Sequence, residues 1–223
     1  MDAPLISGDT CFGTLNVAHD QTHYYTEQSA LKLQCFANWI ALNIQLRLQV
    51  TELNKLALVD HLTGIANRRA FTQHIQRLIR QFHTEGKIFY LGLLDVDHFK
   101  VINDNYGHNT GDYILQKIVT IAASMLDEDG NIYRIGGEEF AIIVTNKNEQ
   151  EVVKLFHAIK DVIANASLKY EASQIPTTVS IGITHIDHYD YDPTALLQRS
   201  DQALYLAKSA GRNRVDMQKP TAA

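Results

Sequence analysis

The chain has 223 residues, 45% of them hydrophobic, which allows one domain of ordinary size plus a smaller appendage and argues against disorder. Its net charge of −5 disfavours non-specific nucleic-acid binding, and the spacing of its 2 cysteines indicates neither a disulfide framework nor a zinc site. Because no apolar run approaches the roughly 20 residues of a membrane span and no signal peptide is visible, we expect a cytoplasmic protein with no nucleic-acid or membrane partner.

Residues 1–25 are predicted to form a small hairpin. Strands over Pro4–Ser7 and Phe12–Val17 flank a plausible turn at Gly8–Thr10. A hairpin of this size cannot bury its apolar face by itself. The segment resembles the last hairpin of a GAF sensory domain, in which such a hairpin precedes a long exit helix. This resemblance implies that most of the sensor is missing and that an upstream signalling input acts on the protein.

Residues 26–58 contain no Gly or Pro and are predicted to form one long helix. Two rows of residues repeat at a spacing of seven: Trp39, Leu46 and Leu53, and Leu42, Gln49 and Leu56. This heptad pattern indicates a coiled-coil linker that joins two copies in a parallel homodimer. The alternative is a helix that packs on its own domain.

The string Asp60-His-Leu-Thr-Gly-Ile-Ala-Asn-Arg-Arg69 follows the long helix. Gly64 is expected to interrupt the helix and Asn67 to cap the next one. Five apolar residues share one face of that next helix: Phe71, Ile75, Leu78, Ile79 and Phe82. The apolar run Ile88–Leu94 then predicts a strand buried on both faces, and Asp95 follows it at a natural metal or catalytic position.

The remaining predicted elements are a helix over about Thr110–Leu126, strands over Asn131–Ile135 and Phe140–Val144, a helix over Glu149–Ala164, a strand over Thr177–Thr184, a helix over Pro193–Ser209 and an edge strand over Arg214–Asp216. Gly136 and Gly137 can take positive φ angles and close a tight hairpin, with Glu138 and Glu139 at or beside its tip. The order strand, helix, two strands, helix, strand predicts an α+β fold of the ferredoxin-like βαββαβ type.

Four motifs in this order carry a family resemblance. The stretch Asp95-Val-Asp-His-Phe-Lys-Val-Ile-Asn-Asp-Asn-Tyr-Gly-His-Asn-Thr-Gly-Asp112 matches every fixed position of the pattern of GGDEF domains, the diguanylate cyclases. The other three are the Asp60–Arg69 string, with Ile65 for the usual Leu, the loop Gly136–Phe140 and the string Lys208–Asn213. The resemblance spans residues 59–216. We therefore expect a partial GAF-like hairpin over 1–25, a helical linker over 26–58, a GGDEF domain over 59–217 and a tail over 218–223.

The resemblance implies that the protein condenses two GTP molecules into cyclic di-GMP and two pyrophosphates in bacterial second-messenger signalling. The resemblance also implies that Mg²⁺, with Mn²⁺ as the alternative, neutralises the triphosphate and is held by Asp95, Glu138 and the carbonyl of Val96. Glu138 is also the candidate base for the 3′ proton, with water or a metal-bound hydroxide as alternatives. Glu139 is placed to assist the metal or to orient the hydroxyl, and Lys100 to stabilise charge on the α-phosphate.

Guanine needs an acceptor for its N1–H and 2-amino groups and a donor for its O6. The carboxylate of Asp112 can accept both protons, and the amide of Asn103 can supply complementary groups. His108 is expected to line the nucleotide site. Two further pairs complete the expected substrate-binding set: Gly136 and Gly137 for close approach to the backbone, and Lys208 and Arg212 for the outer phosphates.

Two alternatives to an active cyclase remain: a catalytically weak GGDEF module that binds GTP and regulates a partner, and another nucleotidyl cyclase on the same fold. The intact Gly-Gly-Glu-Glu-Phe loop disfavours the first, and Asn103 with Asp112 disfavours the second. Many GGDEF enzymes also carry an inhibitory Arg-x-x-Asp site ahead of the two glycines. Here the two places are Asp127 and Gly130, so the resemblance implies no tight product inhibition unless an arginine from elsewhere in the fold substitutes.

Overall fold

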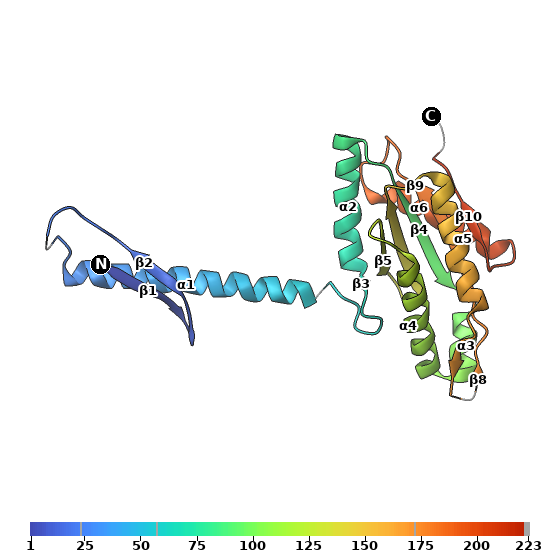
Figure 1. Cartoon of the computed structure of the whole chain (residues 1–223), viewed down its shortest axis with the longest axis horizontal. Helices are drawn as coiled ribbons and strands as arrows, with labels where there is room; N and C mark the ends of the chain where they lie inside the picture. Colours follow the sequence, from blue (N-terminus) through green and yellow to red (C-terminus); the bar gives the residue numbers. More distant parts are fainter. Residues whose placement is uncertain (23, 57, 172, 221–223) are drawn as a thin grey trace. The chain divides into compact units, whose positions relative to one another are not determined.

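The structure is a computed structural model that describes residues 1–22, 24–56, 58–171 and 173–220, without the side chains of 52–56. The chain divides into two compact units, residues 1–57 and 58–223. None of the helices in the described ranges has the length and apolar character needed to cross a bilayer. Figure 1 labels the helices and most of the strands of both units.

The first unit is a hairpin packed on a long helix. β1 (Asp2–Ser7) and β2 (Thr10–Asn16) pair antiparallel, and α1 runs over Glu27–Leu56. The predicted hairpin and helix are therefore present, with ends shifted by at most two residues. Ala3 of β1 is buried with Leu33 and Ala37, so one face of α1 covers the hairpin.

A different face of α1 carries the predicted heptad rows. Trp39, Leu42 and Leu46 are 64%, 58% and 56% exposed, and Gln49 is exposed as well. The side chains of Leu53 and Leu56 lie outside the described residues. The contact of α1 with its own hairpin leaves these rows open, so the coiled coil remains a prediction.

The second unit contains β3 (Ala66–Asn67), α2 (Arg68–Glu85), β4 (Phe89–Val96), α3 (Phe99–Tyr106), α4 (His108–Met125), β5 (Gly130–Arg134), β6 (Glu139–Thr145), α5 (Glu149–Asn165), β7 (Lys169–Tyr170), β8 (Ser173–Gln174), β9 (Val179–His185), α6 (Pro193–Ser209) and β10 (Val215–Met217). The main sheet has the order β10-β9-β4-β6-β5-β3. Its central strands β9, β4, β6 and β5 are antiparallel, and β10 and β3 add parallel edges. This arrangement confirms the predicted ferredoxin-like fold.

The sheet has a core on each face. Alternate residues of β4 enter different clusters: Leu94 packs with α4 and α5 side chains, and Leu91 packs with those of α2 and α6. The prediction of a strand buried on both faces is thus confirmed. The predicted cap is confirmed too, because the Asn67 side chain accepts from the backbone N–H groups of Arg69 and Ala70 and so begins α2.

α6 lies directly against β9 because β9 contributes a glycine at the contact. A Cβ on Gly182 would lie 2.2 Å from the backbone N of Leu204 and from the carbonyl O of Ser200. Backbone atoms cannot move aside as a side chain can, so any larger residue would push the helix away. The close contact carries the last turn of α6, with Lys208, to the end of the sheet where β4 terminates.

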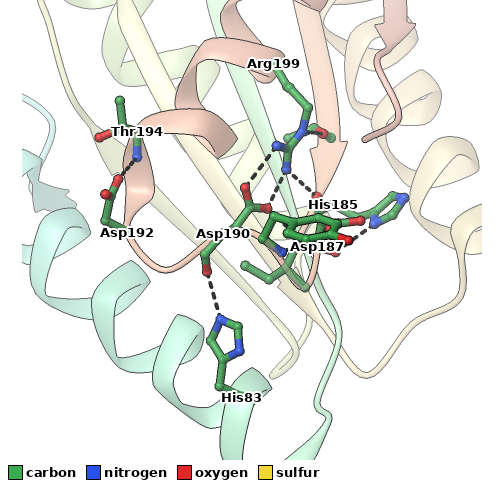
Figure 2. A network of polar contacts seen from close by, with 10 residues as sticks. His83, His185, Asp187, Asp190, Asp192, Thr194 and Arg199 are labelled. Atoms are coloured by element: carbon green, nitrogen blue, oxygen red, sulfur yellow. Dashed lines mark hydrogen bonds and ion pairs between the residues drawn. The ribbon is translucent and has the colours of Figure 1, made fainter. Parts of the chain in front are cut away.

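The opposite end of α6 is fixed by a polar network, shown in Figure 2. The guanidinium of Arg199 donates to both carboxylate oxygens of Asp190, at 3.0 and 2.6 Å, and the Asp190 side chain is only 1% exposed. The carbonyl O of Asp190 lies 2.9 Å from Nε2 of His83 on α2. Asp192 caps the helix by accepting from the N–H of Thr194 at 2.7 Å. These bonds tie the start of α6 to the β9–α6 loop and to α2.

The region after β4 differs from the prediction. An unpredicted helix, α3, follows the strand at once, and α4 begins at His108 instead of about Thr110. Gly107, with φ 84°, separates the two helices. A φ in this region ends a right-handed helix, and glycine adopts it without strain. The apolar spacing after Thr110 indicated α4, whereas α3 is too short to show a periodic pattern.

Candidate active site

The C-terminal end of β4 and the β5–β6 loop lie together. Asp95 stands opposite Glu139 in the antiparallel register of β4 and β6. The backbone N–H of Val96 donates to the carbonyl O of Glu138 at 3.3 Å. The expectation that a hairpin beside a strand end brings these carboxylates to one edge therefore agrees with the geometry.

Asp95 is the buried centre of this edge, with 7% exposure. Nζ of Lys208 lies 2.8 Å from its Oδ2. Burial raises the pKa of Asp95 and the charge of Asp97 raises it further, while Lys208 and Arg212 oppose the rise. The site therefore combines a desolvated carboxylate with cations from the end of α6 and from the loop that follows.

Asp97, two residues away, has a different role. Its carboxylate accepts from Oγ1 of Thr178 and Oγ of Ser180, both at 2.7 Å, and from the backbone N–H of Asn213 at 3.0 Å. Arg212 and Asn213 have φ angles of 61° and 47°, a strained conformation for non-glycine residues. The buried Asp97 thus holds the loop that presents Arg212, and its oxygens are committed to that task.

Glu138 is half-buried at the tip of the β5–β6 loop. Burial raises its pKa, and the negative charges of Asp95 and Glu139 raise it further. A cation is stabilising beside a carboxylate whose ionisation is disfavoured by burial and by neighbouring negative charge. With the backbone oxygen of Val96 the donor set is oxygen only, which suits Mg²⁺ or Mn²⁺. Among the described residues, no group of three or more His, Cys, Asp or Glu side chains could hold a metal, so the predicted site depends on this backbone ligand.

The β5–β6 loop is held by a contact that the sequence did not predict. Nη1 of Arg134 donates to both oxygens of Asp60, at 3.0 and 3.2 Å, and Nε and Nη2 donate to the carbonyl of Gly137, at 3.1 and 2.7 Å. The backbone N–H and Oγ1 of Thr63 also donate to Asp60. Burial raises the pKa of Asp60, but these hydrogen bonds outweigh that effect and hold the pKa below its ordinary value. Arg134 therefore joins the Asp60–Arg69 string to the loop.

The two glycines of the loop act differently from the expectation. Neither Gly136 nor Gly137 has a positive φ, so the predicted left-handed turn is wrong. A Cβ at Gly136 would lie 2.4 Å from Oε2 of Glu139, the end of an exposed side chain that can move aside. Gly137 has open space around its Cα and offers its carbonyl to Arg134.

The predicted base-binding residues lie on α3 and α4. Oδ1 of Asn103 is buried and has no hydrogen-bond partner, and a Cβ on Gly111 would lie 1.9 Å from it. His108 and Asp112 are exposed near the start of α4, and Lys100 is exposed on α3. Within the described residues, no hydrogen bond or ion pair links these three side chains to Asp95 or Glu138.

The fold and the site define a palm-like α+β domain with a buried carboxylate, a second acidic group and two cations at one sheet edge. The family model described as "Diguanylate cyclase, GGDEF domain" matches residues 57–214. The chain therefore belongs to the GGDEF family of diguanylate cyclase domains.

Named relatives agree with this family. The chain is 35% identical over 161 residues to the diguanylate cyclase DgcP of Pseudomonas aeruginosa, covering 72% of this chain and 24% of DgcP. It is 36% identical over 163 residues to the diguanylate cyclase DosC of Escherichia coli K12, covering 72% of this chain and 35% of DosC. Against the diguanylate cyclase DgcZ of Escherichia coli K12 the identity is 35% over 157 residues, covering 70% of this chain and 52% of DgcZ. The chain thus spans about a quarter to a half of these relatives.

Solved structures with 26–29% sequence identity have a similar fold. The coiled coil and GGDEF domain of DgcB from Caulobacter crescentus, in complex with c-di-GMP, has a TM-score of 0.74 at 29% identity, covering 84% of this chain and 99% of that one. Diguanylate cyclase SiaD from Pseudomonas aeruginosa, in complex with its activator SiaC, has a TM-score of 0.69 at 26% identity, covering 86% and 75%. The active GGEEF domain of a diguanylate cyclase from Vibrio cholerae has a TM-score of 0.66 at 28% identity, covering 70% and 99%.

Proposed function

We propose that this protein is an active diguanylate cyclase that condenses two GTP molecules into cyclic di-GMP and two pyrophosphates. The observation that carries the proposal is the buried Asp95 at the end of β4, with Lys208 of α6 in contact with it and Glu138 of an intact Gly-Gly-Glu-Glu-Phe loop beside it. A GTP-binding module without turnover needs no such combination of a desolvated carboxylate, a second acid and a cation.

Asp95, Glu138 and the Val96 carbonyl would hold a Mg²⁺ or Mn²⁺ ion, which would supply positive charge against the triphosphate and Lewis acidity at the α-phosphate. Lys208 and Arg212 add positive charge on the side of α6, where they hold the outer phosphates. Lys100, exposed on α3, stabilises charge on the α-phosphate. His108 lines the nucleotide site from the start of α4.

The bond-forming step needs a proton acceptor near the 3′-hydroxyl. The oxygen of the 3′-hydroxyl attacks the α-phosphorus of the other GTP, and the hydroxyl proton passes to Glu138. Pyrophosphate leaves with the electron pair of the broken P–O bond. The raised pKa of Glu138 supports this role, because a base is more effective as its pKa approaches the operating pH. Glu139 orients the hydroxyl, and Gly136 and Gly137 let the nucleotide approach the loop closely.

The reaction requires two copies of the chain. Each domain holds one GTP, and each 3′-hydroxyl attacks the nucleotide held by the other, which requires a twofold arrangement. The exposed apolar rows on α1, formed by Trp39, Leu42 and Leu46, support a parallel coiled coil that keeps two domains close. The hairpin predicted over residues 1–25 is proposed to be the last hairpin of a GAF-like sensory domain that passes its signal through this helix.

The test is to incubate the purified protein with GTP and Mg²⁺ and to separate the products by chromatography. Cyclic di-GMP and pyrophosphate in a 1:2 ratio are expected. GTP that binds but stays intact would instead identify a regulatory GTP-binding module, and a different cyclic nucleotide would identify another nucleotidyl cyclase. ATP in place of GTP serves as the control for base selection.

A further inference from the structure

The two polar atoms of the Asn103 side-chain amide differ in burial. Its Oδ1 is buried without a hydrogen-bond partner. Its Nδ2 is not buried in this way and donates no hydrogen bond to any residue in the described ranges. Asn103 therefore presents its two N–H donors, and not its acceptor, to anything that enters the space beside α3 and α4.

Gly111 on α4 leaves the space that Oδ1 of Asn103 occupies. A Cβ at Gly111 would lie 1.9 Å from Oδ1 and 3.0 Å from Cγ of Asn103, so any other residue would displace the amide. The φ of Gly111 is not positive, so the position needs glycine for space and not for its backbone conformation. Oxygen is the favoured atom at this contact, because it accepts weakly from the Cα–H, whereas a reversed amide would bury two unpaired donors.

We propose that Gly111 is a positioning residue for base selection, which turns the amide of Asn103 so that Nδ2 donates to O6 of guanine. The inference rests on the proposed function. Guanine presents the O6 acceptor beside its N1–H and 2-amino donors, and Asp112 accepts from the latter two. Adenine carries an amino group where guanine has O6, so this amino group and Nδ2 of Asn103, both donors, would face each other. Gly111 thus excludes adenine without touching the base.

The experiment separates the two contacts with three competitors that carry no γ-phosphate and form no cyclic product. GDP, 6-thio-GDP and IDP displace a fluorescent GTP analogue from the full chain in the presence of Mg²⁺. The sulfur of 6-thio-GDP is a weak acceptor, so the preference for GDP over it reports the Asn103 donor. IDP lacks the 2-amino group and reports the Asp112 acceptor. Each preference is expected to be roughly fivefold to tenfold in the wild type, as for one hydrogen bond.

In Gly111→Ala, the preference for GDP over 6-thio-GDP should fall to about one, while the preference for GDP over IDP stays. Asn103→Ala should lose the same preference, and adding Gly111→Ala to it should change nothing more, because the glycine acts through Asn103. Gly130→Ala is the matched control. It adds a Cβ 2.7 Å from the Leu126 side chain, just beyond the other end of α4, and should leave both preferences unchanged.

Gly111→Ala with an unchanged preference over 6-thio-GDP overturns the inference, and so does a parallel fall of both preferences, which would indicate general loosening of α3 and α4. The added Cβ would also lie 3.1 Å from the Phe99 ring, so the variant can fail to fold. In that case Asn103→Asp decides, because it keeps the shape but has no N–H. A retained preference over 6-thio-GDP in Asn103→Asp overturns the inference. A wild-type chain that binds none of the three overturns the proposed function itself.

Discussion

The guanidinium of Arg134 holds the carboxylate of Asp60 across 74 residues of sequence, and its other nitrogens hold the carbonyl of Gly137. Both side chains are largely buried, 14% and 15% exposed. Asp60 is in turn fixed by Thr63, so the contact joins the start of the domain to the loop that carries Glu138. The position of the loop therefore depends on the segment that links the domain to its helix.

Arg134→Ala should reduce turnover strongly. The loop would lose two donors to Gly137, and a displacement of about 1 Å at a reacting group can cost about 100-fold in rate. Stability should fall by about 1–3 kcal/mol, because the Asp60 carboxylate loses its charged partner but keeps the bonds from Thr63. Arg134→Lys keeps the positive charge but loses the forked guanidinium donors, so its turnover and stability should lie between those of the wild type and Arg134→Ala.

Initial rates and urea unfolding measure these effects. Breaking the exposed Lys219–Glu149 pair with Lys219→Met is the control for loss of a lysine–carboxylate contact far from the loop. Wild-type turnover in Arg134→Ala would show that the loop keeps its position without the arginine.

Glu138→Gln should abolish turnover and leave the fold intact. The amide keeps the shape of the side chain but cannot take the 3′ proton and is a poor ligand for Mg²⁺. The folded-state pKa of Glu138 is raised above 4.5 by burial and by Asp95 and Glu139, so its ionised form is less favourable in the folded chain than in the unfolded one. The variant should therefore have a thermal midpoint at neutral pH no lower than that of the wild type.

The stability difference should shrink as the pH falls through the folded-state pKa, because the wild-type carboxyl then becomes neutral too. Scanning calorimetry over a pH series checks this, and product analysis checks turnover. Cyclic di-GMP at near wild-type rate from Glu138→Gln would remove the residue from the catalytic set.

Lys208→Met should affect metal and nucleotide in opposite directions. Nζ of Lys208 contacts the same carboxylate that is proposed to hold the metal, so its removal should tighten nucleotide-free Mn²⁺ binding by roughly fivefold, the equivalent of about 1 kcal/mol. GTP affinity should fall, because the outer phosphates lose a cation. Calorimetry with Mn²⁺ alone and then with GTP measures both, and weaker Mn²⁺ binding in the variant would show that the lysine supports the metal site.

A chain that starts at Leu58 should lose activity on dilution and regain it when concentrated. The proposed coiled coil of α1 would raise the effective concentration of the second domain, and without it two domains would meet only by diffusion. The specific activity of both chains across a wide dilution series measures the effect. Equal activity per mole at every dilution would exclude α1 as the dimer linker. Trp39→Glu in the full chain, which places a charge in the exposed apolar row, should act in the same direction.

Added cyclic di-GMP should not inhibit tightly through the turn at residues 127–130. Nζ of Lys147 lies 2.6 Å from Asp127, and Nδ2 of Asn146 donates to Asp129 at 2.7 Å, so the acidic groups are held by the β6–α5 turn. A doubly charged phosphodiester finds no arginine in this turn. Initial rates with added product and calorimetry on nucleotide-free protein test the expectation. Strong non-competitive inhibition that disappears when residues 127–130 are changed would contradict it.

Local patterns in the sequence were sufficient for most of the fold. The face of α2, its Asn67 cap and the buried run of β4 are all properties of residues a few positions apart. Such patterns follow from the 3.6-residue period of a helix and the two-residue period of a strand, which are local properties and can be read from the sequence. The family motifs likewise identified the candidate site residues from short stretches of sequence. They did not show how these residues lie relative to one another.

Only the tertiary structure decided what each site residue touches. Asp95 and Asp97 look equivalent in the sequence, yet Asp97 is saturated by Ser180, Thr178 and Asn213, up to 116 residues away, and Asp95 is left with Lys208. The partners come from elements that meet only after the sheet has closed, and no local period records which of them will be neighbours. Whether a side chain such as Asn103 has an unpaired polar atom, and how much space surrounds it, is defined only once those neighbours are in place.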